Sequence, residues 1–395
     1  MSWGRLKEYF SGIASKRLSA VETNPEVSHQ HEYNGTKALK DIFGLDDRTN
    51  IPTRFLWLGE DADTLAEDGF LTWYDSRRNH PTRSEHRLYF NGNPVTERAS
   101  ANDMIVVALR PDGSAMVVVA QTGSTIEGQL KWLFALDSGQ GDAFVTKKFD
   151  GPDNNSLGYV EAYVLAELGI EVEPEASVDV GALVARFGLI FPPTRVLSAL
   201  ARETVVASAK DDPDGALLMW MEQEEALFRA IEREVVKGRL KQGFEEDIDG
   251  FLSFSLSVQN RRKSRAGYAL GNHVEAVLLA NGVAHKREAT TEKAKGPDFL
   301  FPSEAAYHDP GHTQDLRMLA VKTSCKDRWR QVLAEADRIK VKHLLTLEPS
   351  ITVAQTTEMQ SVSLQLVVPS AVLKTYSVEQ QKWVMSFRAF LDLVR

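Results

Sequence analysis

The chain has 395 residues and contains very little cysteine, no long apolar run and no excess of positive charge. Its single cysteine, Cys325, excludes an internal disulfide framework and any zinc site built from several cysteines. No stretch approaches about eighteen consecutive apolar residues, and the N-terminal MSWGRLKEYF lacks the apolar core of a signal peptide. We therefore expect a cytoplasmic protein that has no membrane partner.

Basic residues are outnumbered in this chain. The 46 lysines and arginines stand against 55 aspartates and glutamates, which gives a formal net charge of −9. This balance argues against a protein that coats nucleic acid indiscriminately by bulk charge. A sequence-specific binder needs basic residues on one face only, so local clusters are more informative than the sum. The length also exceeds that of one ordinary compact core and favours two domains.

The first half of the chain shows a β-rich pattern. Short runs of β-branched and aromatic residues recur between 52 and 150 at roughly ten-residue spacing. A short helix is expected within residues 1–20, ahead of this region. Strands are expected at 54–59, 69–74, 86–91, 104–110 and 115–121, with a Pro-Asp-Gly turn at 111–113 between the last two. The pattern predicts a small β-barrel or sandwich.

A basic cluster, RRNHPTRSEHR, occupies residues 77–87 within this β-rich region. Arginines in such a loop pair with guanine edges or with phosphates, and Glu85 is suited to accept from a cytosine amino group. The alternative is a solvated hairpin rim with ordinary charges. Composition alone leaves both interpretations open.

The second half of the chain alternates helices and strands. The acidic EVEPE at 171–175 is typical of a linker and places a domain boundary near 172–180. Alternation of this kind predicts an α/β sheet layered by helices. Helices are expected at 194–209, at 214–241, from the basic run 261–265 to Asn281-Gly282, at 325–339 and at the C-terminus with Trp383, Phe387, Phe390 and Val394 in register; strands are expected at 298–301, 316–323, 343–347 and 363–368.

Asp298 and Lys322 occupy the ends of two successive expected strands. Asp298 follows a proline and opens the strand 298–301, whereas Lys322 lies at the end of the strand 316–323. An acid and a lysine in these places suit metal-dependent hydrolysis of a phosphodiester. A nuclease of the PD-(D/E)XK type usually carries a second acid two residues before the lysine, but here that residue is Ala320. A Mg²⁺ ligand must therefore come from elsewhere in the chain.

Two glutamates are candidates for this ligand, because each borders the inward face of an expected helix. Glu335 lies on the helix 325–339, and Glu275 lies on the earlier helix that ends near 281. We predict that Asp298 and Glu335 bind Mg²⁺, that Lys322 activates the attacking water and offsets charge in the transition state, and that Glu275 is an outer ligand or positions water. The alternative is that Asp298 merely starts a strand and Glu335 is a solvated helix position.

Lys326, Asp327 and Arg328 lie between the second strand and its following helix. Lysine and arginine donate to guanine O6 and N7, and aspartate accepts from cytosine N4, so this trio suits a run of G·C pairs. The alternative is helix capping by Ser324 and Asp327. The two roles are compatible.

Several segments resemble the EcoRII restriction endonuclease family. The likeness to its catalytic domain is dense from about 255 to 370 and rests on NRRKSRAG (260–267), GPDFLFPS (296–303), AYHD (306–309) and LRMLAVKTSCKDRWRQ (316–331). Toward the N-terminus it is patchy, with KRLSA (16–20), SHQ (28–30), SR (76–77) and TRSEHR (82–87) in places where the family has an effector-binding domain. The resemblance implies a type IIE restriction endonuclease: a homodimer that uses Mg²⁺ to cut both strands of a short palindrome of the CC…GG kind, with a cognate DNA methyltransferase in the same restriction–modification system.

The resemblance also assigns residues. It implies a catalytic PD-(D/E)XK domain at 184–395 whose second acid has moved to the following helix, which fits the alanine at 320. Asp298, Lys322 and Glu335 match the family's active-site positions, and Tyr307 matches a tyrosine linked to activity. The segment 326–328 matches the family's base-reading residues.

For the first half, the resemblance implies a DNA-binding pseudobarrel at 1–172, followed by a linker at 173–183. In relatives this domain binds a second copy of the site as effector and blocks the catalytic cleft when it is empty. Its contact residues correspond to Arg77, Arg83, Glu85 and Arg87, with His29 a less close match. Two positions depart from the family: Pro81 replaces a lysine, and His86 replaces another basic residue.

The rival function is a DNA-binding protein, sequence-specific or methylation-sensing, that does not cleave the unmodified site. The two acids and the lysine argue against it, since a regulator that does not cut DNA has no chemical need for all three.

Overall fold

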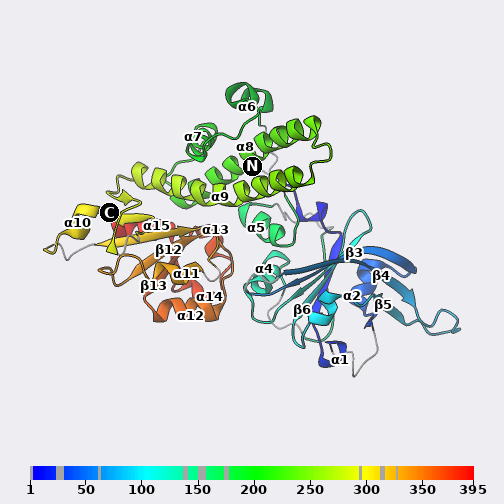
Figure 1. Ribbon diagram of the computed structural model, residues 1–395. Helices are drawn as coiled ribbons and strands as arrows, with labels where there is room; N and C mark the ends of the chain where they lie inside the picture. The colour runs from blue at the N-terminus through cyan, green and yellow to red at the C-terminus, as the bar shows by residue number, and fades with distance from the viewer. Residues whose placement is uncertain are drawn as a thin grey trace. The chain divides into compact units, whose positions relative to one another are not determined.

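The computed structural model describes residues 3–23, 31–60, 64–136, 141–149, 157–172, 178–292, 296–311, 316–325 and 328–395. Contacts between these residues divide the chain into an N-terminal unit, Trp3–Val172, and a C-terminal unit, Glu173–Arg395 (Figure 1). Across these described ranges, no helix combines the length and the apolar character needed to cross a membrane.

The N-terminal unit is built on a sheet whose described strands follow the order β2-β5-β4-β3-β7-β6-β1-β8. Neighbouring strands pair antiparallel, except β3 and β7, which are parallel. The five strands expected from the sequence are present as β3 to β7. The strands are β1 (Gly12–Arg17), β2 (Glu32–Asn34), β3 (Arg48–Leu58), β4 (Thr64–Asp75), β5 (His86–Phe90), β6 (Met104–Leu109), β7 (Ala115–Ala120) and β8 (Val145–Lys148).

The central strands of this sheet are buried on both faces. Side chains alternate along each strand, so Leu56 and Val106 enter one core while Trp57 and Val107 enter the other. Helices α4 (Thr125–Leu133) and α5 (Tyr159–Glu167) contribute to the first core, and α2 (Lys37–Phe43) and α3 (Pro94–Arg98) contribute to the second. The mixed α/β character of the unit follows from this double cover.

The prediction of a helix within residues 1–20 is wrong for most of that segment. Its central residues form β1, preceded by a short 3-10 turn at Leu6–Glu8 and followed by α1 at Ala20–Thr23. Strand β1 lies between β6 and β8 and pairs with both, so distant hydrogen-bond partners decide its conformation.

The C-terminal unit contains a mixed sheet whose described strands follow the order β14-β13-β12-β11-β10-β9. Strands β11 to β14 are parallel, whereas β10 runs antiparallel to both β11 and β9. The C-terminal ends of β11 and β12 and the N-terminal end of β10 therefore meet at one edge of the sheet. The strands are β9 (Lys286–Arg287), β10 (Phe299–Phe301), β11 (Arg317–Lys322), β12 (Lys342–Thr346), β13 (Leu364–Val368) and β14 (Met385–Ser386).

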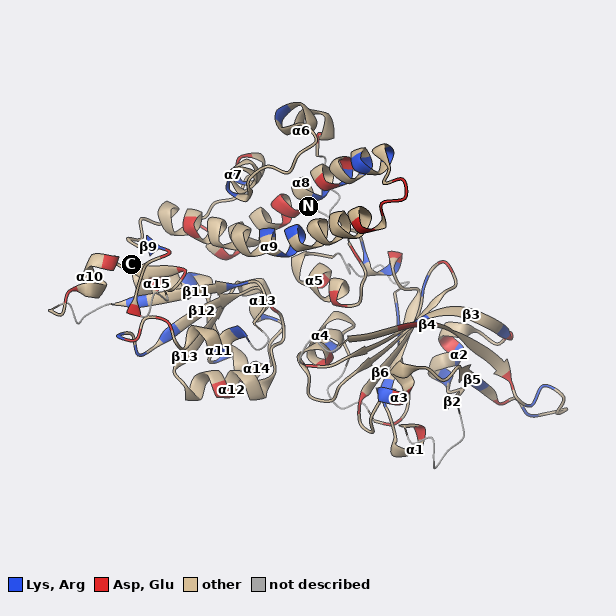
Figure 2. Cartoon of the chain, viewed as in Figure 1, with Lys and Arg blue, Asp and Glu red and all other residues tan. Residues whose placement is uncertain are grey.

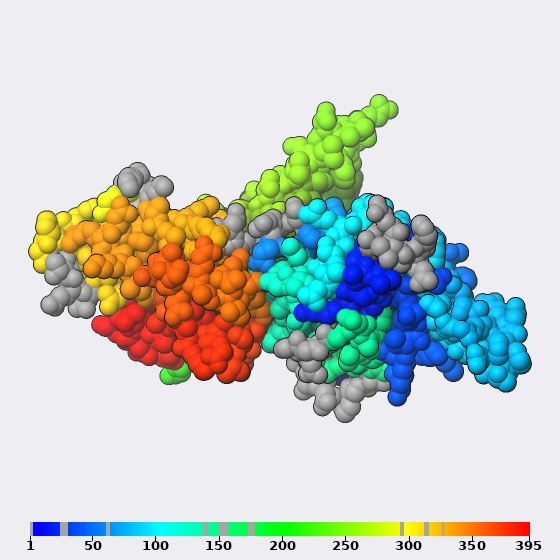
Figure 3. All heavy atoms as spheres, turned by 90° about the horizontal axis from the view of Figure 1, so that it is seen from below, coloured from blue at the N-terminus to red at the C-terminus, as the bar shows by residue number. Residues whose placement is uncertain are grey.

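Two long helices dominate the helical part of this unit. Helices α8 (Pro213–Gln242) and α9 (Ile248–Ala280) form a hairpin, and its yellow-green tip stands out as an exposed arm in Figure 3. Helix α9 stops where the sequence predicts, at Asn281, and Gly282 then adopts the left-handed φ of 68° that favours glycine. The other helices are α6 (Val180–Phe187), α7 (Thr194–Thr204), α10 (Glu304–His308), α11 (Trp329–Val332), α12 (Val353–Ser361), α13 (Ser370–Leu373), α14 (Val378–Gln381) and α15 (Phe387–Val394).

Three segments differ from their expected structure. Helix α6 begins at Val180, inside the expected linker 173–183, because the Asp179 side chain accepts a hydrogen bond from Ala182 N and caps it. Within the described part of the expected helix 325–339, only Trp329–Val332 is α-helical, and turns follow up to residue 339. Trp383 does not lie on the final helix but in a turn before β14. In this turn its carbonyl accepts a hydrogen bond from Gln365 Nε2 at 2.8 Å.

Candidate active site

Asp298 and Lys322 meet at the edge of the C-terminal sheet. The pairing of Phe299 with Leu319 brings the residue that precedes β10 beside the end of β11. Lys322 Nζ donates to Asp298 Oδ2 at 3.2 Å, and Val321 N donates to the same oxygen at 2.7 Å. The Asp298 side chain is 39% exposed and that of Lys322 is 19% exposed, so solvent reaches the pair. The site thus holds a carboxylate and an ammonium, both accessible to solvent, where the start of β10 meets the end of β11.

Glu335 was predicted on a helix, but it lies in the turn that follows α11. The backbone N of Glu335 still donates to Val332 O at 3.1 Å, and its carbonyl accepts from Lys342 Nζ at 2.6 Å. Among the residues that the structure describes, no group of three or more His, Cys, Asp or Glu side chains is placed to hold a metal ion. Asp298 and Glu335 therefore remain a predicted ligand pair.

Glu275 is bound to arginines. Its Oε2 accepts from Arg287 Nη1 at 2.7 Å and from Arg195 Nη2 at 3.4 Å. These side chains line a hollow of about 470 Å³ together with Thr194, Tyr268, Asn272 and Glu288. The lining includes neither Asp298 nor Lys322, so the contacts of Glu275 do not support its predicted role as an outer ligand.

Tyr307, on α10, is fully buried. Its hydroxyl donates to Glu292 Oε2 at 2.5 Å. Burial, and then the hydrogen bond to Glu292, raise the pKa of Tyr307 to about 12. The phenol is therefore neutral near pH 7 and unsuited to act as a base or nucleophile there. Glu292 itself was not predicted, because it lies in a loop that carries no motif.

Of the predicted base-reading residues, Lys326 and Asp327 lie outside the described residues, and Arg328 is exposed at the start of α11. The segment before them is anchored by Glu348, which is buried just beyond the end of β12. Glu348 Oε2 accepts from Cys325 N at 2.5 Å and from Ser324 Oγ at 3.3 Å. The Ser324 hydroxyl thus contacts Glu348, which argues against the capping role considered for it.

Of the predicted effector contacts, Arg77, Arg83 and Glu85 lie on the loop between β4 and β5, part of which is blue in Figure 2, and Arg87 lies on β5. Arg77 Nε lies 2.5 Å from Glu85 Oε2, and Arg87 binds the other oxygen of Glu85. The hydrogen bond from Arg87, together with the charge of Arg77, lowers the pKa of Glu85. Arg83 is exposed, and His29 lies outside the described residues.

His86, one of the two departures from the family pattern, belongs to the scaffold. The residue is 4% exposed, and its ring stacks on Trp73 with the ring centroids 4.9 Å apart. Because a carbonyl only accepts, His86 Nε2 carries the proton and donates to Leu45 O at 3.0 Å. This histidine is therefore unsuited to contact DNA.

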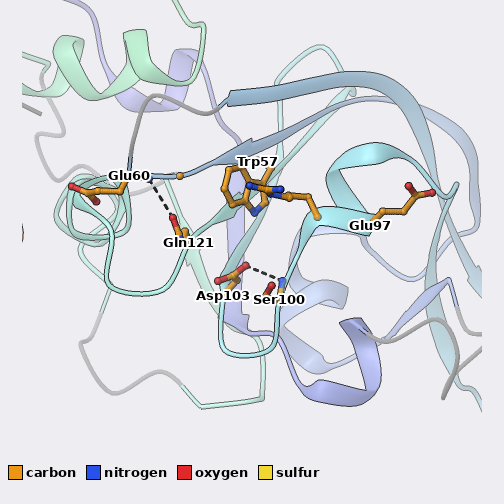
Figure 4. Close-up of a pocket in the computed structure, with 8 residues that line it drawn as sticks. Trp57, Glu60, Glu97, Ser100, Asp103 and Gln121 are labelled. Carbon is orange, nitrogen blue, oxygen red and sulfur yellow. Dashed lines mark hydrogen bonds between the residues drawn. The ribbon is translucent and has the colours of Figure 1, made fainter. Parts of the chain in front are cut away.

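Another hollow, of about 490 Å³, lies in the N-terminal unit (Figure 4). The Arg98 guanidinium covers the Trp57 ring at 4.8 Å from its centroid. Asp103 accepts from Ser100 N at 2.9 Å. The polar groups of this hollow therefore hold the turns around it, and sequence reasoning gave no sign of it. The lining residues are Trp57, Gly59, Glu60, Glu97, Arg98, Ser100, Asp103 and Gln121.

Comparison with known proteins finds likenesses to the C-terminal unit. Residues 228–391 match the family model described as EcoRII C terminal. Over 182 residues the chain is 44% identical to the Type II restriction enzyme EcoRII of Escherichia coli. The second half of this chain is therefore similar in sequence to that enzyme. The alignment covers 46% of this chain and 45% of that relative, so it spans less than half of either protein.

Glu275, Asp298, Tyr307, Lys322 and Glu335 all fall inside the EcoRII C-terminal match. Structural superposition gives weaker likenesses: metal-depleted Ecl18kI in complex with uncleaved DNA is 16% identical with a TM-score of 0.45 and covers 54% of this chain and 82% of that one. The PspGI–substrate DNA complex is 16% identical with a TM-score of 0.42 and covers 56% and 97%.

Proposed function

We propose that this protein is a type II restriction endonuclease of the IIE kind, a Mg²⁺-dependent enzyme that cuts both strands of a short palindrome beginning CC and ending GG. The observation that carries the proposal is the 3.2 Å contact between Lys322 Nζ and Asp298 Oδ2, at the ends of two strands within the segment that matches the EcoRII C-terminal family model. In this proposal the domain is of the PD-(D/E)XK type, with its second acid at Glu335.

The residues fit a divalent cation by their chemistry. Mg²⁺ prefers carboxylate oxygens, and the partly exposed Asp298 carboxylate offers such oxygens at a place open to solvent. A bound Mg²⁺ would lower the pKa of a water and offset charge on the phosphate. Lys322 then orients the attacking water and stabilises the developing negative charge, with Glu335 as the second acid.

The same proposal gives the N-terminal unit the effector role. The segment 76–87 would bind a second copy of the site through Arg77, Arg83 and Arg87, with the unit acting as a pseudobarrel that inhibits cleavage until DNA binds it. Lys326, Asp327 and Arg328 would read the G·C pairs at the catalytic domain. A palindromic site implies a two-fold homodimer, because each active site then meets one strand. A cognate methyltransferase would protect the host DNA.

Digestion of plasmid tests the function. The full chain is incubated with Mg²⁺ and either unmethylated or cytosine-methylated plasmid, beside Lys322→Ala and the surface control Lys382→Ala. We expect discrete fragments from the unmethylated plasmid with the wild type and the control, and none with Lys322→Ala. Cleavage of methylated plasmid only would favour the methylation-sensing alternative, and cleavage of neither plasmid would favour a DNA-binding regulator.

A further inference from the structure

An acid on a turn is not held in place by sheet register. Residue 320, where the second acid usually lies in a PD-(D/E)XK nuclease, is fixed by its pairing with Leu344 of β12. Glu335 instead follows the four-residue helix α11 within the turn 333–339. So short a helix has little stability of its own. If Glu335 is a metal ligand, other groups must fix its backbone.

Lys342 binds one side of this turn. Its side chain is directed at the turn from the start of β12, and the residue is only 8% exposed. Lys342 Nζ donates to the carbonyls of Glu335 at 2.6 Å, Ala336 at 3.0 Å and Ile339 at 3.1 Å. These contacts use all three donors of the ammonium group. Burial lowers the pKa of Lys342, which the negative charges of Asp337, Glu335 and Glu292 oppose. Three charge-assisted hydrogen bonds from one buried ammonium restrict the backbone of this turn strongly.

A second set of groups binds the backbone N–H groups of the same turn. Ala336 N donates to Thr291 Oγ1 at 3.4 Å, Asp337 N to Glu292 Oε2 at 3.2 Å and Arg338 N to the Tyr307 hydroxyl at 3.3 Å. The Tyr307 hydroxyl in turn donates to Glu292. Three successive N–H groups are thus held by side chains from two other segments.

The backbone conformation of the turn is consistent with its restraint by these hydrogen bonds. Ala336 has a φ of 48°, in the left-handed region that L-residues rarely adopt. This conformation persists only where the surroundings determine it. The Ala336 carbonyl is bound by Lys342 and its N–H by Thr291, so the surroundings do so on both sides.

We propose that Lys342 and the Tyr307–Glu292 pair are positioning residues that fix the turn 333–339 and thereby aim the Glu335 carboxylate at the metal. This inference rests on the proposed function, in which Asp298 and Glu335 hold Mg²⁺. It gives Tyr307 a role that needs no contact with DNA. The clamp formed by these three side chains replaces the sheet register that an acid at position 320 would have.

The experiment compares full-length wild type with Lys342→Met, Tyr307→Phe and the control Lys382→Met. Lys382 is an exposed lysine of the same unit, paired with Glu379. Single-turnover cleavage is measured across a Mg²⁺ titration, and Mn²⁺ binding to the protein–DNA complex is followed separately by electron paramagnetic resonance. Circular dichroism and metal-free DNA binding confirm that each variant is folded.

We expect Lys342→Met to raise the Mg²⁺ concentration for half-maximal cleavage by about 10- to 100-fold, as loss of groups that orient metal ligands does, and to weaken Mn²⁺ binding in parallel. The effect of Tyr307→Phe should be smaller and in the same direction, and Lys382→Met should match the wild type. If Lys342→Met does not fold, Tyr307→Phe decides the question. An unchanged half-maximal concentration and unchanged Mn²⁺ binding in folded variants would overturn the clamp, whereas a wild type that never cleaves would instead refute the proposed function.

Discussion

Lys322 Nζ lies 3.2 Å from Asp298 Oδ2, and the two residues are 24 positions apart in the chain. The antiparallel pairing of β10 with β11 brings them together, and the Val321 N–H, which donates to the same oxygen, fixes the carboxylate. This arrangement supplies the proposed active site with a carboxylate of set orientation and a neighbouring positive charge.

The first prediction concerns Asp298. Replacement of Asp298 by Asn keeps the shape and an acceptor for Val321 N but removes the charge that a cation requires. We expect cleavage to fall by at least about 100-fold, while metal-free DNA binding stays near the wild-type level. A gel-shift assay beside single-turnover cleavage measures both quantities, and retention of full cleavage would exclude Asp298 as a ligand.

The second prediction concerns Arg83, on the loop between β4 and β5. Arg83 is exposed, so its charge is available to a phosphate, whereas Arg77 and Arg87 are bound to Glu85. Arg83→Ala should weaken DNA binding by the N-terminal unit and lower the slope of log affinity against log salt by about 1. The matched control is Arg54→Ala on β3, where Arg54 pairs with Asp68. Identical salt slopes for Arg83→Ala and the wild type would count against a phosphate contact.

The autoinhibitory role is tested by truncation. A fragment of residues 178–395 keeps Asp179, which caps α6, and lacks the N-terminal unit. If that unit blocks the catalytic cleft, the fragment should cleave DNA with a single site faster than the full chain does. Equal single-turnover rates on a one-site plasmid would contradict autoinhibition.

His343 gives a prediction for pH. This residue on β12 is 2% exposed; burial, and then the charge of Arg317, lower its pKa to about 4. A histidine whose folded pKa is depressed contributes stability that is present above about pH 6.5 and lost as pH falls toward 4. From pH 7 to pH 5, the free energy of unfolding should therefore fall by about 2 kcal/mol through His343 alone.

The measurement for His343 is urea unfolding of the wild type and His343→Gln at both pH values. Other groups titrate in the same range, so the quantity compared is the pH-dependent difference between the two proteins. The stability of His343→Gln should fall less on acidification. An equal fall in both proteins would show that His343 is not responsible.

Much of the fold follows from local sequence pattern. The strands β3 to β7 and β10 to β13 are recognisable because buried runs such as MIVVAL and AMVVVA stand between turn residues. The end of α9 is marked by Asn281 and Gly282. The pairing of Asp298 with Lys322 was also accessible, since each residue lies at the end of a recognisable strand.

Features that depend on contacts between residues distant in the chain could not be predicted from the sequence. Strand β1 is decided by pairing with β6 and β8, and α11 gives way to a turn that Lys342 holds from β12. His86 has the composition of a basic DNA contact, yet its burial against Trp73 makes it scaffold. Neither Glu292 nor Glu348 belongs to a motif, and their hydrogen bonds appear only in three dimensions.

The most direct test of the central claim is single-turnover cleavage of a short end-labelled duplex with one palindrome that begins CC and ends GG, by wild type and Lys322→Ala in Mg²⁺. An unlabelled second duplex supplies the effector copy. We predict that the wild type cuts both strands at one position, while Lys322→Ala binds the duplex and leaves it intact. Cleavage by Lys322→Ala at the wild-type rate, or no cleavage by either protein, would contradict the assignment.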